Sequence, residues 1–550
     1  MSSQPSEGRE RPPIYIILPR EPLPLGGAEE VGNKAWNLMR LAEAGLPVPA
    51  AFVLPTVWSR ESRAAQGGVA LRTALTEGIK RLELETGLSF GSSRKPLLVS
   101  VRSGAAISMP GMMETVLDIG VNDETVEGLV RLTGNPRLAW DSYRRLIQGF
   151  AEVVQQLPTE PFDALIQDVL ATEGEESERM LDHRALRQLT RAMLARFQEM
   201  ARTPFPQAPA DQLARATEAV FRSWDAPKAA EYRRLNQIDD DIGTAVTVQT
   251  MVFGNAGGTS GAGVGFTRDP ATGENILYLD LQFNGQGEDV VAGRVALQDA
   301  SLLRAILPAV WNRLEAIRPQ LEAMFGDVQD FEFTVQEGQL HLLQTRRAKR
   351  TPWAALKIAV DLVEEGLLKP EQALEQIGSI DPHSVALARL SGTQNAPLAH
   401  ATVAGIGVAA GRIAFDTSGA KRFADNGDPA ILTRRETTTG DIAGMANAAG
   451  ILTSLGGRTS HAAVVARQLG KVCLVGCADL SINLQDRTCR IGQSSFAEGD
   501  WLTLDGNSGA VYGGRLGVIT ERPERELASI LRWRESPRAG PATPAAAHVA

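Results

Sequence analysis

Long apolar runs, positive net charge and cysteine are all scarce in this chain of 550 residues. No stretch approaches the roughly 20 uninterrupted apolar residues of a membrane span. The start, MSSQPSEGRERPPIYIILPR, also lacks the apolar core of a secretory signal. We therefore expect a cytoplasmic protein that is not bound to a membrane. The formal net charge of −9 argues against unspecific binding of nucleic acid.

The 3 cysteines are too few for a disulfide framework, and all of them lie late in the chain: Cys473, Cys477 and Cys489. The string CLVGC has a poor spacing for zinc, and neither a histidine nor further cysteines lie close by. We expect these residues to be buried thiols that pack as small apolar side chains.

The length exceeds what one hydrophobic core usually supports, so two or more domains are expected. The composition, 43% apolar and 22% charged, is ordinary for a globular protein. The hydrophobic period predicts a helix in GNKAWNLMRLAEAG that Gly45 closes, and helices from about 123 to 240. It predicts strands with glycine-rich turns from TAVTVQTMVFGN to LHLLQTR, and a compact α/β unit from about 401 to 514.

His461 lies in GGRTSHAAVVARQLG, where a glycine turn precedes a helix that Gly470 ends. Thr459 and Ser460 are both candidates for the N-cap. At such a helix start, unpaired backbone N–H groups and the positive end of the helix dipole favour an anion, and they lower the pKa of an imidazole. His461 could therefore carry a phosphoryl group. Taken alone, the pattern also fits a purely structural histidine.

Two carboxylates in VQDFEFTVQEGQLHLLQTR form a second signal. Asp330 and Glu332 are two residues apart on a predicted strand and point to the same face. Gln344 and Arg346 follow on the returning strand. Mg²⁺ needs only one or two carboxylates when phosphate oxygens complete its coordination, so the hairpin could hold Mg²⁺ and polyphosphate. The alternative is an acidic face that is simply exposed to solvent.

Two basic residues, Lys34 in VGNKAWNL and Arg102 in VSVRSGA, are placed near glycines at the ends of predicted elements, where their side chains could reach phosphates. The run GNAGGTSGAGVGFTRDPATG, which starts at Gly254, either lets backbone N–H groups approach phosphates or builds turns. It is neither a Walker A loop nor a dinucleotide fingerprint, because the required lysine and the strand-to-helix context are missing.

Together these residues resemble the pyruvate, phosphate dikinase family closely, from about Gly26 to Gly514. The resemblance is carried by LLVSVRSGAAISMPGMMETVL, AWDSYRRLIQGF, TGENILYLDLQFNGQGEDVVAG, LLQTRRAKRT and GGRTSHAAVVARQLGKVCLVGC. It implies an α/β and α+β multidomain chain, in which an ATP-grasp-type nucleotide-binding domain with a helical insertion is joined to a swivelling α/β phosphohistidine domain. The implied ranges are a disordered start (1–20), the nucleotide-binding domain (21–350, insertion about 123–240), a helical connector and linker (351–400), the phosphohistidine domain (401–515), and a short helix with a disordered tail (516–550).

The resemblance also implies roles for single residues. Positions that match the family's nucleotide site are Lys34, Arg102, Gly111, Thr115, Gln249, Glu332, Gln344 and Arg346. Asp330 and Glu332 match its Mg²⁺ ligands, and His461 matches the histidine that is phosphorylated. Thr459 matches a threonine that plant members use for regulation, and we interpret it here mainly as a cap or a phosphate contact. The chain departs from the family at Gly285, usually alanine, and at Asp280, usually glutamate.

The resemblance implies a transferase that uses ATP, inorganic phosphate and Mg²⁺ to phosphorylate His461, with Arg102 and Arg346 acting in catalysis. The family's pyruvate-binding barrel would begin where this chain ends, and a barrel needs roughly 250 residues. We therefore expect only a partial reaction, with the phosphoryl group passed to an acceptor bound elsewhere, such as pyruvate on a separate barrel protein. Alternatives are a different small-molecule or protein acceptor, or a nucleotide-sensing regulatory subunit without catalysis. Neither nucleic acid nor a membrane is an expected partner, and a homo-oligomer is left open.

Overall fold

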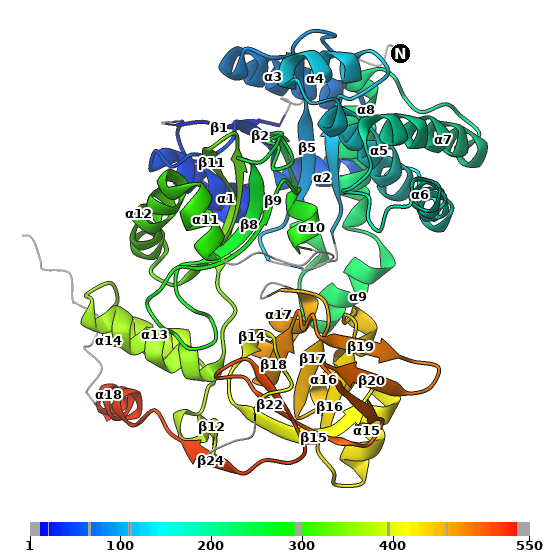
Figure 1. Ribbon diagram of the computed structural model, residues 1–550. Coiled ribbons are helices and arrows are strands. Elements are labelled where there is room, and N and C mark those ends of the chain that lie inside the picture. Colours follow the sequence, from blue (N-terminus) through cyan, green and yellow to red (C-terminus); the bar gives the residue numbers. More distant parts are fainter. Residues whose placement is uncertain are drawn as a thin grey trace, which may run out of the picture. The chain divides into compact units, whose positions relative to one another are not determined.

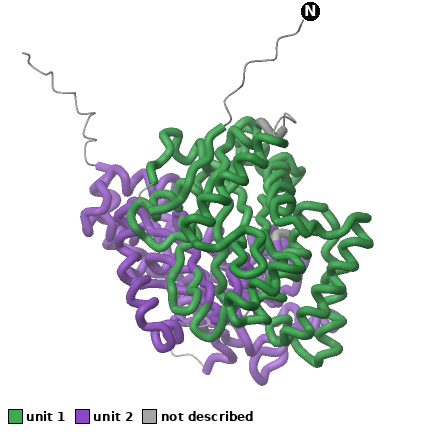
Figure 2. Tube along the Cα trace, turned by 90° about the horizontal axis from the view of Figure 1, so that it is seen from above, with its two compact units in different colours: residues 1–260, 334–345 green, residues 261–333, 346–550 purple. Residues whose placement is uncertain are grey.

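The computed structural model describes residues 12–19, 21–63, 68–107, 109, 113–291, 300–392, 396–457 and 460–535. The chain divides into two compact units, which Figure 2 distinguishes by colour. Unit 1 comprises residues 1–260 and 334–345, and unit 2 comprises residues 261–333 and 346–550. This division differs from the domain boundaries expected from the sequence, which stay a prediction. Within the described residues, no helix is long and apolar enough to cross a membrane.

Unit 1 is built on a five-stranded antiparallel sheet in the order β1-β2-β7-β5-β6. Its strands are β1 (Tyr15–Ile17), β2 (Ala51–Leu54), β5 (Val99–Gly104), β6 (Thr115–Ile119) and β7 (Ala245–Thr250), and a small pair is formed by β3 (Ser89–Phe90) and β4 (Pro96–Leu97). The helices that lie between its first strands in the sequence are α1 (Gly27–Glu43), α2 (Thr56–Arg63) and α3 (Gly68–Thr86). The predicted first helix is confirmed, with Gly45 directly after its C-cap at φ 73°.

Strand β1 corrects part of the expectation that residues 1–20 are disordered. Tyr15, Ile16 and Ile17 pair with β2 and complete one edge of the sheet. Ile17 is buried, and the Trp58 indole N–H donates a hydrogen bond to the carbonyl of Pro13. The short apolar run IYII thus contains a strand. The prolines and charged residues around it made this strand hard to predict from the sequence.

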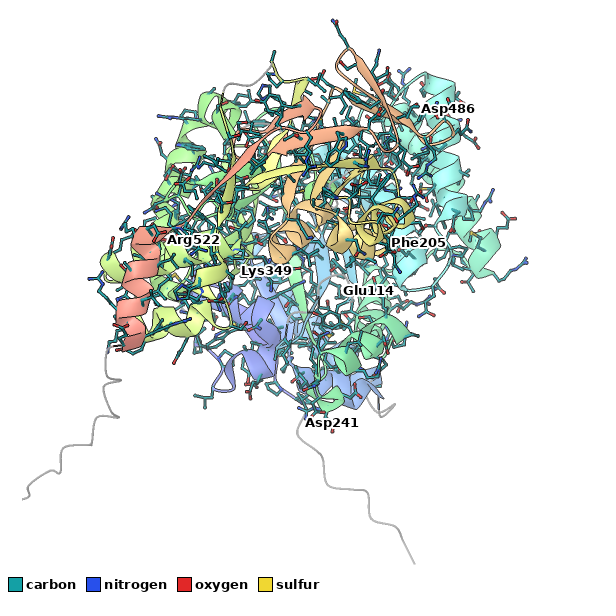
Figure 3. All side chains as sticks on the ribbon, turned by 90° about the horizontal axis from the view of Figure 1, so that it is seen from below. Glu114, Phe205, Asp241, Lys349, Asp486 and Arg522 are labelled. Carbon is teal, nitrogen blue, oxygen red and sulfur yellow. The ribbon has the colours of Figure 1, made fainter. Side chains whose placement is uncertain are left out.

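The predicted helical segment in unit 1 is confirmed. It contains α4 (Thr125–Thr133), α5 (Pro136–Val153), α6 (Glu160–Glu173), α7 (His183–Ala201), α8 (Pro209–Ser223), α9 (Pro227–Leu235) and the 3₁₀ turn η1 (Asp240–Ile242). Aromatic rings hold its core: Phe205, labelled in Figure 3, makes edge-to-face contacts with Tyr143, Phe150 and Phe197 at centroid distances of 6.1, 5.4 and 5.3 Å. Such pairs stabilise a fold beyond the area that they bury.

A four-stranded sheet in the order β11-β10-β8-β9 begins unit 2. Its strands are β8 (Gly261–Phe266), β9 (Tyr278–Phe283), β10 (Gln329–Gln336) and β11 (Gln339–Arg347), and the tip of the last hairpin, residues 334–345, is counted with unit 1. Between β9 and β10 lie α10 (Gly287–Val291), α11 (Ala300–Ile306) and α12 (Pro308–Phe325). The expectation of strands throughout this region was wrong there, because α10 is short and Pro319 inside α12 obscures the helical signal.

The glycines of β8 make room for aromatic rings rather than turns. A Cβ on Gly263 would lie 2.5 Å from the Phe333 ring, and one on Gly265 would lie 2.3 Å from the Phe331 ring. Phe331 and Phe333 therefore fill one face of the sheet. Because side chains alternate along a strand, Asp330 and Glu332 lie on the opposite face.

A helical connector follows the hairpin. It contains α13 (Pro352–Glu364), α14 (Pro370–Ile377), η2 (Pro382–Ser384) and β12 (Leu387–Leu390), and the end of the described chain returns to it through β24 (Val518–Glu521) and α18 (Glu524–Glu535). Arg268, after β8, is fully buried and donates to Glu322 of α12 (Nη2–Oε2 2.8 Å) and to Glu365 after α13 (Nη1–Oε1 3.0 Å). Burial alone would lower the pKa of this guanidinium, but the two carboxylates raise it.

The predicted α/β unit is an eight-stranded sheet in the order β13-β23-β22-β15-β16-β17-β18-β14 (Figure 1). Its members are β13 (Ala399–His400), β14 (Thr402–Gly405), β15 (Val408–Ala414), β16 (Ala430–Arg434), β17 (Gly450–Thr453), β18 (Val472–Val475), β22 (Trp501–Asp505) and β23 (Ala510–Gly513). Strands β15 to β18 are parallel neighbours. They are joined by α15 (Thr417–Asp425), η3 (Thr439–Asp441), α16 (Ile442–Asn447) and α17 (His461–Leu469), and a three-stranded sheet is added by β19 (Leu480–Asn483), β20 (Thr488–Ile491) and β21 (Ser494–Ala497).

The three cysteines are buried free thiols, as expected. Burial raises the pKa of the Cys473 thiol to about 12, so this group stays protonated.

Candidate functional site

The polar face of the unit 1 sheet carries three residues of the predicted nucleotide site. Val99 and Val101 of β5 are buried in the core, so Ser100 and Arg102 occupy the other face. Arg102 is paired across the sheet with Thr115 on β6 and with Thr247 on β7, and Ser100 is paired with Gln249. The sheet thus brings Arg102, Thr115 and Gln249 together on one side.

Lys34 is brought to the same end of β5 by a break in α1. Gly32 has φ 77° and ψ 152°, and a Cβ there would lie 2.1 Å from the Gly104 carbonyl oxygen. The break lets the Asn33 N–H donate to the carbonyl of Ala105, 3.1 Å away. A side chain at Gly104 would lie 3.9 Å from Lys34 Cβ, so the lysine stem starts beside the strand that carries Arg102.

Gln344 lies on β11 in the part of the hairpin that belongs to unit 1. It is buried, and its neighbours anchor the strand: Arg102 Nη1 donates to the Leu343 carbonyl (3.4 Å), and the Asn37 amide donates to the Thr345 carbonyl (2.9 Å). The five predicted residues of unit 1 that the structure describes are Lys34, Arg102, Thr115, Gln249 and Gln344. They come from α1 and four strands.

The acidic face, defined as the face of the unit 2 sheet with Asp280, Asp330 and Glu332, carries the predicted metal ligands. Asp280 is the cross-strand partner of Val264, which points away from the Phe331 ring and therefore to this face. Asp330 is buried and accepts a hydrogen bond from Arg346 Nε at 2.9 Å. Burial raises the pKa of Asp330, Arg346 opposes this shift, and Glu332 adds to it.

The acidic face fits Mg²⁺ only as a site that phosphate completes. Among the described residues, no group of three or more His, Cys, Asp or Glu side chains is placed to hold a metal ion. Asp330 and Glu332 supply two carboxylates, which is what Mg²⁺ takes from a protein when nucleotide phosphates fill its other positions. Arg346 forms an ion pair with Asp330, and its guanidinium is a group that commonly binds phosphate oxygens in proteins.

His461 is the first residue of α17, as the sequence predicted. Ser460 is the N-cap and accepts from the Ala463 N–H at 3.5 Å, and Gly470 ends the helix with φ 63°. Thr459 and Gly111 lie outside the described residues.

Thr437 contacts the imidazole and was missed by sequence reasoning. Its hydroxyl lies 3.2 Å from His461 Nδ1, although the two residues are 24 positions apart. Thr437 follows β16 and His461 follows β17, and these strands are parallel neighbours. The carboxyl ends of adjacent parallel strands meet at one edge of a sheet, and this rule is the signal that could have found Thr437.

Asp441 sets the charge around the histidine. Its carboxylate accepts from the Thr438 N–H at 2.9 Å and lies 3.5 Å from Arg434. Burial lowers the pKa of His461, and Asp441 acts in the opposite direction with a smaller effect. The imidazole is therefore neutral near pH 7. Because Nδ1 lies beside the Thr437 hydroxyl, Nε2 is the ring nitrogen that this contact does not engage.

Two family models match the chain, one over strands of the unit 1 sheet and one over the His461 helix. The model described as pyruvate phosphate dikinase, AMP/ATP-binding domain matches residues 59–310, and the model described as PEP-utilising enzyme, mobile domain matches residues 426–509. Pyruvate, phosphate dikinase of Clostridium symbiosum is 42% identical over 518 residues, 92% of this chain. The chain is thus similar to pyruvate, phosphate dikinases over 92% of its own length and over the ranges of both models.

Other members of the dikinase family show the same extent of similarity. Pyruvate, phosphate dikinase of Giardia intestinalis is 40% identical over 92% of this chain, and the chloroplastic protein 1 of Zea mays is 40% identical over 93%. The chain spans 58% of the length of the Clostridium and Giardia proteins and 54% of the Zea mays protein. The first model covers Arg102, Thr115 and Gln249, and the second covers Thr437 and His461.

Replacing Thr437 by valine tests whether the hydroxyl holds the imidazole ring of His461 in place. The change keeps the volume but removes the contact to Nδ1, so we expect phosphorylation of His461 to slow about tenfold, the equivalent of one ordinary hydrogen bond. Thr437→Ser should restore most of the rate. The measurement is the rate of acid-labile labelling from ATP. Equal rates for Thr437→Val and the unchanged chain would contradict the assignment.

Proposed function

We propose that this chain is the ATP- and phosphate-dependent part of a dikinase, in which His461 becomes phosphorylated and AMP and pyrophosphate are released. The position of His461 at the start of α17, with Nδ1 beside the Thr437 hydroxyl, is the observation that carries the proposal. The backbone N–H groups at this helix start favour a phosphoryl group on the ring.

The chemistry requires two transfers. Nε2 of His461 attacks the β-phosphorus of ATP, the bond to the α-phosphate oxygen breaks, and AMP leaves with that oxygen. An oxygen of inorganic phosphate then attacks the terminal phosphorus of the pyrophosphorylated histidine. The P–O–P bond breaks, pyrophosphate leaves, and one phosphoryl group remains on His461. The Nδ1 proton is retained and donated to Thr437 Oγ1 throughout.

Nucleotide binding is assigned to the residues predicted from the sequence. Phosphoryl transfer requires mainly positioning and stabilisation of charge. Lys34, Arg102 and Arg346 supply positive charge, and Thr115, Gln249 and Gln344 supply polar groups from β6, β7 and β11. Asp330 and Glu332 would hold Mg²⁺, which neutralises phosphate charge when it is bound.

The phosphoryl group of His461 is then passed to an acceptor. The names of the relatives indicate pyruvate, and we propose that the acceptor binds outside the residues described above. A protein that contained only a nucleotide sensor would never form phosphohistidine.

Isotope position distinguishes these steps. With Mg²⁺ and β-labelled ATP, we expect acid-labile, base-stable label on the protein. With γ-labelled ATP, label should appear on the protein without phosphate and leave it as pyrophosphate when phosphate is added. Absence of label from either ATP would overturn the proposal. Release of the γ-label as inorganic phosphate in water alone would show that water, rather than phosphate, is the acceptor.

A further inference from the structure

Arg467 is a buried arginine on the helix that starts with His461. It lies six residues after the histidine, near the end of α17, and is 1% exposed. Arginine is almost never fully buried unless it is paired. A charge in this position therefore needs an explanation that the packing of the helix alone does not supply.

The contacts of Arg467 are incomplete for a buried guanidinium. Nη1 donates to the Ala404 carbonyl at the long distance of 3.5 Å, and the guanidinium carbon lies 5.5 Å from the centroid of the Phe266 ring. Within the described part of the chain, Nε and Nη2 of Arg467 have no hydrogen-bond partner. Phe266 belongs to β8, so the Arg467 side chain reaches from the α/β domain to the four-stranded sheet of unit 2.

Phe266 lies on the acidic face. It pairs across the sheet with Tyr278, two residues before Asp280, and both point away from the Phe331 and Phe333 rings. A second contact joins the same two parts of unit 2, because the Tyr278 hydroxyl on β9 donates to the Val403 carbonyl on β14 at 2.9 Å. Burial lowers the pKa of the Arg467 guanidinium, while Tyr278, Cys473, Asp280 and Asp330 act in the opposite direction. Asp280 and Asp330 of the acidic face thus lie within electrostatic range of Arg467.

We infer that Arg467 is a positioning residue, which holds the His461 helix on the acidic face so that His461 can be phosphorylated from the nucleotide. The inference rests on the proposed function, because it assumes that ATP is the phosphoryl donor. Arg467 does not touch the reacting atoms. Six residues of helix separate it from His461, about 9 Å along a rigid axis, so a shift of one end moves the other.

The inference predicts that Arg467 is needed for one phosphoryl donor and not for another. Phosphoramidate phosphorylates histidines from solution without any nucleotide site. A residue that only stabilises the α/β domain would affect both donors equally. A residue that positions the helix on the acidic face would affect ATP alone.

The test compares Arg467→Met with Arg422→Met, an exposed arginine on α15 of the same domain. A misplacement of about 1 Å costs roughly 100-fold in rate, so we expect ATP-dependent labelling of Arg467→Met to slow by about 100-fold with KM for ATP little changed. Labelling by phosphoramidate should be unchanged, and Arg422→Met should behave like the unchanged chain with both donors. Equal slowing with both donors, or no slowing with ATP, would overturn the inference.

A second pair of variants keeps the test independent of folding. Arg467→Lys retains the charge and should recover part of the ATP-dependent rate. Asp280→Asn removes charge from the acidic face, and its effect on the rate should be smaller in Arg467→Met than in the unchanged chain. Strictly additive effects of the two changes would contradict the coupling. If the unchanged chain takes no label from ATP, the proposed function fails, whereas labelling of the unchanged chain and Arg467→Met at the same rate refutes only the inference.

Discussion

Replacing His461 by asparagine is expected to abolish the acid-labile label that the chain takes from ATP. Asparagine can occupy the first turn of α17 and keeps a polar group near Thr437, but it offers no nitrogen lone pair that attacks phosphorus. Loss of a nucleophile costs on the order of 10⁵–10⁶ in rate in other enzymes, so the label should fall below detection. The measurement is acid-labile label per chain after incubation with β-labelled ATP and Mg²⁺.

His400→Asn is the matched control, because His400 is an exposed histidine on β13 of the same domain. It should be labelled like the unchanged chain. Label that persists in His461→Asn would place the phosphoryl group on another residue.

The pH dependence of the labelling rate follows from the lowered pKa of His461, because the neutral form persists below the usual titration range of histidine. The rate should therefore stay constant as the pH falls from 8 through 7 and drop only at pH values below about 6.5.

Replacing Arg268 by methionine is expected to cost about 3–5 kcal/mol of unfolding free energy, the range measured when one member of a buried ion pair is removed. Methionine fills much of the volume, so the loss comes mainly from Glu322, whose buried carboxylate would be left without its cation. Because Glu322 belongs to α12 and Glu365 follows α13, the variant should also loosen the packing of the connector. Urea denaturation followed by circular dichroism measures the effect on the transition of unit 2.

Arg525→Met serves as the comparison for Arg268→Met. Arg525 pairs with Glu364 on α13, but both side chains are exposed, so water replaces the lost partner and little change is expected. Adding Glu322→Gln to Arg268→Met should recover part of the stability, since it removes the unpaired charge. An unfolding midpoint of Arg268→Met within error of that of Arg525→Met would contradict the assigned role.

The local features of the histidine helix could be predicted because they are encoded within a few residues. Ser460 caps the helix, His461 begins it and Gly470 ends it, all within 11 consecutive positions. The alternation that puts Asp330 and Glu332 on one face is likewise a property of a single strand. Short-range rules of this kind need no knowledge of the tertiary structure.

Contacts that depend on strand order could not be predicted in the same way. Thr437 meets His461 only because β16 and β17 are neighbours, and Arg467 meets Phe266 across 201 positions of sequence. The glycines of β8 were interpreted from the sequence as turns or phosphate contacts, whereas their spacing matches the rings of Phe331 and Phe333 on another strand. The nucleotide residues of unit 1 were assigned through family resemblance, and their roles stay a prediction.

The pairing of β12 with β24 has a consequence for the conformational entropy of the chain. Leu387 to Leu390 are hydrogen-bonded antiparallel to Val518 to Glu521, so everything between them forms a closed loop of the polypeptide. The entropy lost on closing a loop grows only with the logarithm of its length, roughly 0.6 kcal/mol for each doubling. Inserted elements such as the three-stranded sheet β19–β21 therefore add very little to the entropy cost of closing this loop. The α/β domain can lengthen or shorten between these two strands while the ribbon that holds both of its ends stays the same.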